Sequence, residues 1–128
     1  GKKGSLMMKY VISVKEQSLD ARVDSRFGRA QMFALYDSKT GECSWHPNTQ
    51  NFQAAQGAGI QTAQNVVNLG AEAVISGHCG PKAYRVLEAA GVRIYSIEGN
   101  PTIKEAVQMI ESGKIKAMEG ADVEGHWV

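Results

Sequence analysis

The second half of the chain alternates short apolar runs with amphipathic segments, and this alternation limits the folds that the chain can adopt. An apolar run at residues 73–75 precedes a segment with helical spacing at Pro81–Ala90, which ends at a glycine. A second run at residues 92–97 precedes another such segment at Thr102–Ser112, which also ends at a glycine. This order predicts parallel strands joined by right-handed helical crossovers.

The first half of the chain predicts three more strands and one more helix. A run rich in β-branched residues at Lys9–Lys15 precedes a polar loop at Glu16–Arg29. The segments Gln31–Asp37 and Glu42–His46 are separated by turn-forming residues and are expected to pair as an antiparallel hairpin. Apolar residues recur at helical spacing from Ala58 to Leu69. The whole pattern predicts an α/β fold with a mixed five-stranded sheet.

The size of the chain fits one domain. With 128 residues, 43% of them hydrophobic, it can bury a core of its own. We expect that domain at residues 9–113, after a leader or cloning remnant at 1–8. The tail at 114–128 is predicted to be an edge strand, an arm or unstructured. Exposed edge strands would allow a homodimer, although nothing in the sequence specifies one.

Charge and cysteine content narrow the range of partners. The net charge is +1 and the basic residues are scattered, which argues against a nucleic-acid partner. No apolar run approaches the roughly 20 residues that cross a bilayer, and no signal peptide is recognisable, so no membrane partner is expected. Cys43 and Cys79 lie far apart and form no disulfide framework or structural zinc motif, which suits a reducing cytoplasm.

Three polar segments are expected to meet at one edge of the sheet. If the strand at 9–15 runs upward, the loop at 16–29, the loop at 48–59 and the turn after residue 75 all lie at the carboxyl ends of the parallel strands. Open α/β sheets bind their ligands at this edge. The candidate binding residues there are Arg26, Phe27, Gly28, Arg29, Gly59, Gly77, His78, Cys79, Gly80 and Lys82.

The residue types at this edge favour an anionic guest that contains metal and sulfur. Arg26, Arg29 and Lys82 supply positive charge, and two predicted helix N-termini supply N–H donors. Cys79 lies beside one helix start and is predicted to be held as a thiolate. Cys79 and His78 are therefore candidate metal ligands, since thiolate and imidazole bind iron, copper and zinc. A single cysteine leaves an iron–sulfur cluster incompletely ligated, which predicts transient binding or sharing between two chains.

Two other functions fit part of this pattern. Residues 78–85 match the His-Cys-x5-Arg pattern of cysteine phosphatases, but Pro81 removes an N–H donor and Arg85 would lie more than one turn inside the helix. A module that senses phosphate or another small anion would use the same edge and would leave Cys79 structural. Burial in the core is also an alternative for Cys79 and Phe27, since both residue types are commonly buried.

Three motifs in the same order resemble the dinitrogenase iron–molybdenum cofactor biosynthesis family, which includes NifX, NifY, the carboxyl-terminal domain of NifB and the orange proteins. The motifs are the RFGRA sequence at 26–30, the GAGIQTA sequence at 57–63, and the strand–Gly-x-x-Gly-Pro-x-Ala segment at 73–83. The resemblance spans about Lys9 to Ser112. The positions that match the family pattern are Arg26, Phe27, Gly28, Gly59, Gly77, Gly80 and Pro81.

The resemblance implies a three-layer α/β sandwich of ribonuclease H-like topology. It also implies a non-enzymatic carrier or chaperone for an iron–sulfur or molybdenum-containing cluster, with cluster donor or acceptor proteins as partners. A molybdenum/iron or copper sulfide cluster, transiently bound, is the expected cargo. His78 and Cys79 occupy variable positions of the family motif, so their ligand role follows from their own chemistry. The strand at Lys9–Lys15 lacks the carboxylates of ribonuclease H enzymes, which argues against nuclease activity.

Overall fold

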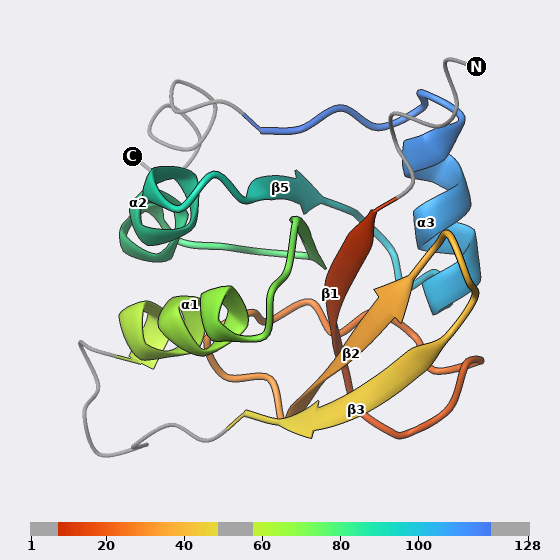
Figure 1. Ribbon diagram of the computed structural model, residues 1–128, viewed down its shortest axis with the longest axis horizontal. Coiled ribbons are helices and arrows are strands. Elements are labelled where there is room, and N and C mark those ends of the chain that lie inside the picture. Colours follow the sequence, from red (N-terminus) through yellow and green to blue (C-terminus); the bar gives the residue numbers. More distant parts are fainter. Residues whose placement is uncertain (1–7, 49–57, 119–128) are drawn as a thin grey trace.

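The computed structural model describes residues 8–48 and 58–118 and has helices on both sides of one sheet (Figure 1). The strand order is β3-β2-β1-β4-β5. β1 pairs antiparallel with β2 and parallel with β4, so the sheet is mixed, as the sequence predicted. The elements are β1 (Lys9–Val14), β2 (Met32–Asp37), β3 (Cys43–Pro47), α1 (Ala58–Asn68), β4 (Ala73–Ser76), α2 (Pro81–Ala89), β5 (Arg93–Ser96) and α3 (Ile103–Glu111).

The central strand β1 carries apolar side chains on both of its faces because both faces are covered. Tyr10, Ile12 and Val14 belong to a core cluster that includes the buried side of α3. Val11 points to the opposite face and belongs to a second cluster with residues of α1 and α2, among them Leu87. Successive side chains of a strand alternate between faces, so one strand supplies both cores. The molecule therefore has three layers, with α3 on one face and α1 and α2 on the other (Figure 1).

α3 begins with a capping box, in which a threonine is followed three residues later by a glutamate. The Thr102 hydroxyl accepts the Glu105 N–H at 3.3 Å, and the Glu105 carboxylate accepts the Thr102 N–H at 2.9 Å. The hydrogen bond from the Thr102 backbone lowers the pKa of Glu105. The helix stops at Gly113, whose φ of +87° is a conformation that a glycine adopts without a steric penalty.

The ends of the described structure extend slightly beyond the predicted domain. Met8 is buried against the α3 side of the sheet, so packing starts one residue before position 9. After α3, the Met118 N–H donates to the Ile94 carbonyl oxygen at 2.7 Å, and Ile115 packs against the same core as α3. This part of the tail thus borders β5. Residues 1–7 and 119–128, which hold the rest of the predicted leader and tail, lie outside the described residues.

Among the helices of 8–48 and 58–118, none has the length and apolar character needed to span a bilayer.

Candidate functional site

A pocket of about 740 Å³ lies where the predicted segments meet, at the carboxyl ends of β1 and β4. The loop after β1, the start of α1 and the turn between β4 and α2 all contribute to its wall. The lining residues are Ser25, Arg26, Phe27, Gly28, Arg29, Gly59, Ile60, Gly77, His78, Gly80, Pro81, Lys82 and Ala83. Of the ten candidate binding residues, the lining includes all except Cys79. Residues 49–57 of the predicted Asn48–Gly59 loop lie outside the described residues.

Direct backbone contacts join the loop after β1 to the turn after β4. Arg26 and His78 form a parallel β-bridge, and the Phe27 N–H donates to the His78 carbonyl oxygen at 3.2 Å. Gly77 lies against Ser25, where a side chain would find no room. The two segments therefore meet as the chain direction predicted, although about fifty residues separate them in the sequence.

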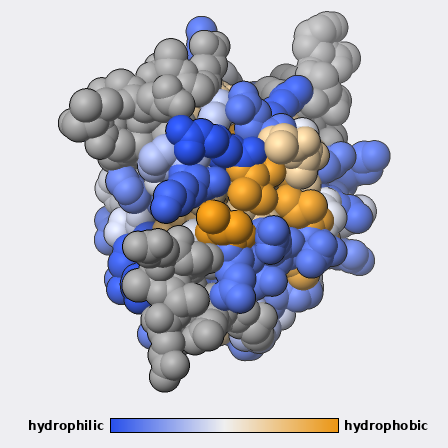
Figure 2. All heavy atoms as spheres, turned by 90° about the vertical axis from the view of Figure 1, so that its left-hand side faces the viewer, coloured by the Kyte–Doolittle hydropathy of each residue, from blue (hydrophilic) through white to orange (hydrophobic). Residues whose placement is uncertain are grey.

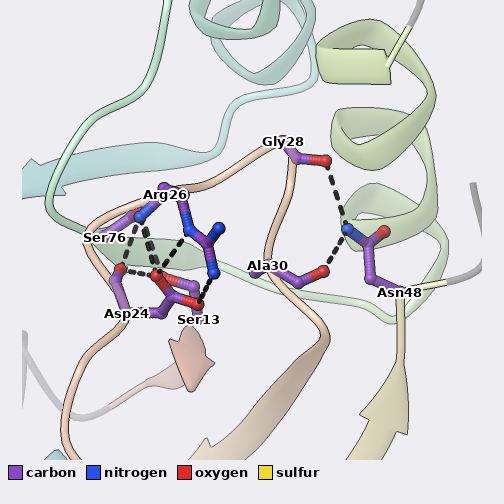
Figure 3. Close-up of polar contacts among 7 residues, drawn as sticks. All are labelled: Ser13, Asp24, Arg26, Gly28, Ala30, Asn48 and Ser76. Atoms are coloured by element: carbon purple, nitrogen blue, oxygen red, sulfur yellow. Dashed lines mark hydrogen bonds and ion pairs between the residues drawn. The ribbon is translucent and has the colours of Figure 1, made fainter. Parts of the chain in front are cut away.

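Serine side chains at the ends of the parallel strands hold these loops in place. The Ser13 hydroxyl of β1 lies 2.7 Å from the Asp24 carbonyl oxygen and 2.9 Å from the Ser76 hydroxyl of β4 (Figure 3). The Ser96 hydroxyl of β5 donates to the Gly77 carbonyl oxygen at 2.9 Å. Ser13 and Ser76 are buried, so their hydrogen bonds replace water for groups that would otherwise be unsatisfied.

Below the pocket rim, a buried carboxylate contacts one of the pocket arginines. The Asp24 side chain is 1% exposed, whereas the Arg26 side chain is 56% exposed. Asp24 Oδ1 accepts the Arg26 backbone N–H at 3.0 Å and Nε–H at 3.3 Å, and Oδ2 lies 3.4 Å from Nη2 (Figure 3). The exposed end of Arg26 is thus connected to a carboxylate that belongs to the interior.

On the opposite side of the loop, Asn48 connects three parts of the chain. Its side-chain amide donates to the Ala30 carbonyl oxygen at 2.8 Å and to the Gly28 carbonyl oxygen at 3.4 Å (Figure 3). The Thr62 hydroxyl of α1 lies 3.2 Å from the same Gly28 oxygen and 3.3 Å from the Asn48 side-chain oxygen. Asn48 and Thr62 are buried, so this network fixes the loop against the helix.

Three cationic side chains line the pocket, and no acidic side chain does so among the described residues. They are Arg26 and Arg29 from the loop and Lys82 from the first turn of α2. The pocket also contains residues from the N-terminal turns of α1 and α2, and the positive end of a helix dipole favours anions. Apolar atoms complete the wall, including those of Ile60 and Ala83. Figure 2, which shows the face that carries α1 and α2, has hydrophobic side chains bordered by hydrophilic ones. This combination suits a compact anion that is only partly hydrated.

The prediction of a Cys79 thiolate was wrong. Cys79 is 2% exposed and packs in the core cluster of α1 and α2. Burial raises the pKa of its thiol to about 12, because the surroundings lack the solvation that a thiolate needs. The nearby helix start does not compensate for this loss. In this conformation Cys79 is therefore a neutral packing residue, and its sulfur is not part of the pocket wall.

The two predicted metal ligands differ in their position: Cys79 is buried and off the pocket lining, whereas the ligand role of His78 stays a prediction. His78 lies on the pocket lining, as predicted. Within 8–48 and 58–118, however, no three His, Cys, Asp or Glu side chains come together in a way that could hold a metal ion. The phosphatase arrangement also fails to form in the described structure, because Cys79 is buried and neutral and Arg85 is not on the pocket lining.

Sequence reasoning missed the buried polar residues Asp24, Asn48 and Thr62, and it missed Ser25, Ile60 and Ala83 on the pocket lining. Asp24 lies two residues before Arg26, and an Asp at this spacing can accept the N–H two positions later. Asn48 directly follows a strand. These local signals existed, but they did not indicate which side chains would be buried.

Known proteins are similar to this chain in sequence and in fold. A family model described as dinitrogenase iron-molybdenum cofactor matches residues 8–113. An uncharacterized protein of Methanocaldococcus jannaschii is 28% identical over 100 residues, which cover 77% of this chain and 84% of that protein. The apo form of the orange protein from Desulfovibrio gigas has 34% identity and a TM-score of 0.79, over 89% of this chain and 95% of that one. A putative NifB protein from Thermotoga has 30% identity and a TM-score of 0.71, over 87% and 93%.

Proposed function

This chain belongs to the dinitrogenase iron-molybdenum cofactor family, and we propose that it is a non-enzymatic carrier or chaperone for an anionic metal–sulfide cluster or its precursor. The family and the two structural relatives associate the chain with iron–molybdenum cofactor biosynthesis or cluster binding in general. The cargo we propose is an iron–sulfur, molybdenum/iron or copper-containing sulfide cluster.

One observation carries this proposal: the pocket joins three cations to two helix N-termini and has no carboxylate on its described lining. Sulfide and thiolate-like sulfur atoms on a cluster accept hydrogen bonds from guanidinium, ammonium and backbone N–H groups. The apolar part of the wall removes water from the guest, which strengthens these contacts. The pocket would therefore hold a negatively charged cluster through charge and hydrogen bonds.

Such binding suits a carrier. Because Cys79 is buried and neutral, no protein thiolate has to leave the metal when the cargo moves on. Release then requires only that a partner compete for the hydrogen bonds of the pocket. We accordingly propose cluster donor and acceptor proteins as partners and a cytoplasmic location. The strand order β3-β2-β1-β4-β5 with an antiparallel β2 supports the ribonuclease H-like topology that we also propose.

Anaerobic reconstitution tests this function. The purified chain is incubated with iron, molybdenum, copper and sulfide, passed through a desalting column, and analysed by visible absorption and by metal and sulfide content. We expect uptake by the wild type and by Cys79→Ala, and strongly reduced uptake by the double variant Arg26→Gln/Lys82→Gln. Arg93→Gln on β5 is the matched control, because Arg93 is exposed and lies outside the pocket lining.

Several results would contradict the proposal. Uptake that is absent in the wild type, or equal in the wild type and the double variant, would show that this pocket does not hold a cluster. Uptake lost in both Cys79→Ala and Cys79→Ser, with both variants folded, would show that the Cys79 sulfur takes part in binding. Binding of molybdate or phosphate without cluster uptake would favour a small-anion module. Hydrolysis of an aryl phosphate that disappears in Cys79→Ser would establish the phosphatase instead.

A further inference from the structure

We infer that Asp24 is a positioning residue that orients Arg26 for contact with the guest of the pocket, an inference that rests on the proposed function. A carboxylate beneath a cationic pocket works against the binding of an anion, so its presence there needs a physical reason. Asp24 is 1% exposed, and a buried carboxylate is costly unless it is paired and hydrogen-bonded. Its carboxylate oxygens accept hydrogen bonds from Arg26, through the backbone N–H and through Nε and Nη2.

The main chain of Asp24 is held by the sheet itself. Its N–H donates to the Ser13 carbonyl oxygen at 2.6 Å, and its own carbonyl oxygen lies 2.7 Å from the Ser13 hydroxyl. The Ser76 hydroxyl supports this pair from β4, 2.9 Å from the Ser13 hydroxyl. These contacts join Asp24 to two adjacent parallel strands. The backbone of Asp24 is therefore held firmly against the sheet, and its carboxylate has a well-defined position next to Arg26 (Figure 3).

A guanidinium group can contact two partners at once because its five N–H donors lie in one plane. In Arg26, the edge formed by Nε and Nη2 faces Asp24. Nη1 and the second N–H of Nη2 lie on the other edge, and Arg26 lines the pocket with more than half of its side chain exposed. Asp24 therefore sets the plane of the guanidinium and leaves a pair of donors for the guest.

This arrangement reduces the cost of ordering a long side chain when the guest binds. An exposed arginine loses rotamer freedom on binding, whereas one already held by a fixed carboxylate loses less. The alternative is competition, in which Asp24 keeps Arg26 away from the guest. The two models predict opposite signs for the coupling energy between Asp24 and Arg26. If Asp24 positions Arg26, the contribution of Arg26 to binding falls when Asp24 is replaced. If Asp24 competes with the guest, that contribution rises.

A double-mutant cycle measures this sign. The probe is tetrathiomolybdate, a sulfur-containing dianion, with molybdate as its sulfur-free counterpart, and affinity is measured by anaerobic calorimetry on the full chain. The variants are Asp24→Asn, Arg26→Gln and the pair together, since Asn keeps an oxygen that can accept the Arg26 backbone N–H. We expect Arg26→Gln to weaken binding about tenfold in the wild type and about twofold or less in the Asp24→Asn background.

A second readout does not depend on the guest. The Nε–H group of Arg26 should exchange with water more slowly in the wild type than in Asp24→Asn, and the NMR signal of that group measures the exchange.

The Arg26→Lys variant provides a test if Asp24→Asn does not fold, because position 26 is exposed and tolerates substitution. Lysine keeps the charge but lacks the planar fork, so we expect it to bind nearly as weakly as Arg26→Gln.

The outcomes separate the two ideas. If Arg26→Gln costs as much or more in the Asp24→Asn background, or if Arg26→Lys binds like the wild type, the positioning role is wrong while the proposed function stands. If the wild type binds neither anion and takes up no cluster, the proposed function fails and the positioning role fails with it. If both anions bind and the cycle gives the expected values, the positioning role of Asp24 is supported. The ratio of the two affinities then measures how strongly the pocket prefers sulfur over oxygen.

Discussion

Gly77 lies so close to Ser25 that a β-carbon at position 77 would be 2.6 Å from the Ser25 Cα. That atom belongs to the backbone, so it cannot rotate away as the end of a flexible side chain could. The contact joins the end of β4 to the loop that carries Arg26 and Phe27. The geometry of the pocket therefore depends on the absence of a side chain at this position.

Gly77→Ala should destabilise the protein and displace the loop. Overpacking of a well-packed contact costs about 1–3 kcal/mol, and here the backbone has to move. Urea unfolding measures the loss, and the affinity for tetrathiomolybdate should fall with it. The control is Gly80→Ala, where a β-carbon meets nothing within 4 Å. Because Gly80 is the N-cap of α2, we expect a cost below about 1 kcal/mol there. Equal costs at the two positions would show that the approach to Ser25 is unimportant.

Asn48→Ala should also destabilise the fold, by about 1–3 kcal/mol. The substitution removes the donor to the Ala30 and Gly28 carbonyl oxygens and leaves buried acceptors without that partner. Chemical denaturation measures the change, and faster hydrogen exchange in the loop at 28–30 would locate it. Asn68→Ala, on the exposed surface at the end of α1, should shift stability by less than about 0.5 kcal/mol. Similar midpoints for both variants would argue against a structural role of Asn48.

The stability of the protein should depend on Cys79 at alkaline pH. Burial raises the pKa of this thiol to about 12, so the folded chain keeps a proton that the unfolded chain releases near pH 9. The stabilisation is complete below pH 9 and is lost as the pH rises toward 12, by up to about 1.4 kcal/mol per pH unit. Urea unfolding between pH 8 and 10 should show a steeper decline in the wild type than in Cys79→Ala. Parallel declines would mean that the thiol ionises normally.

The two cysteines should differ in their reaction with iodoacetamide. Cys43 on β3 is half-buried, whereas Cys79 is 2% exposed. At pH 8 we expect the Cys79→Ala variant to be alkylated at least about tenfold faster than the Cys43→Ala variant, because Cys79 has to wait for local opening of the structure. Mass spectrometry follows the labelling. In 6 M urea the two rates should become similar, and a fast reaction of Cys79 in the native protein would contradict its burial.

The position of the pocket could be predicted because it depends on chain direction alone. Once β1 and β4 are parallel, the segments that follow them have to leave the same edge, so Arg26 and His78 meet regardless of the details of packing. The start of α3 was predictable for a different reason, because the capping box of Thr102 and Glu105 is a local pattern that does not depend on the rest of the fold.

Burial could not be predicted in the same way. Cys79 follows a strand and precedes a helix, and those neighbours favour a thiolate. The apolar cluster that encloses its side chain, however, has residues from the sheet and from the loop after β1 as well as from α1 and α2. Asp24 and Asn48 are polar residues in irregular segments, where most such side chains are solvated. Their burial depends on Ser13, Ala30 and Thr62, whose positions follow only from the assembled fold.

The hydrogen bond from Met118 to Ile94 has a consequence for self-association. Strand-by-strand growth of a sheet needs two available sides, because each added copy has to offer a new side to the next. In the described structure the Ile94 carbonyl oxygen on the outer side of β5 already accepts a hydrogen bond from its own chain, and β3 is the other outer strand. Two copies that pair through β3 would expose only these partly covered β5 edges, which favours a closed dimer over an open fibre.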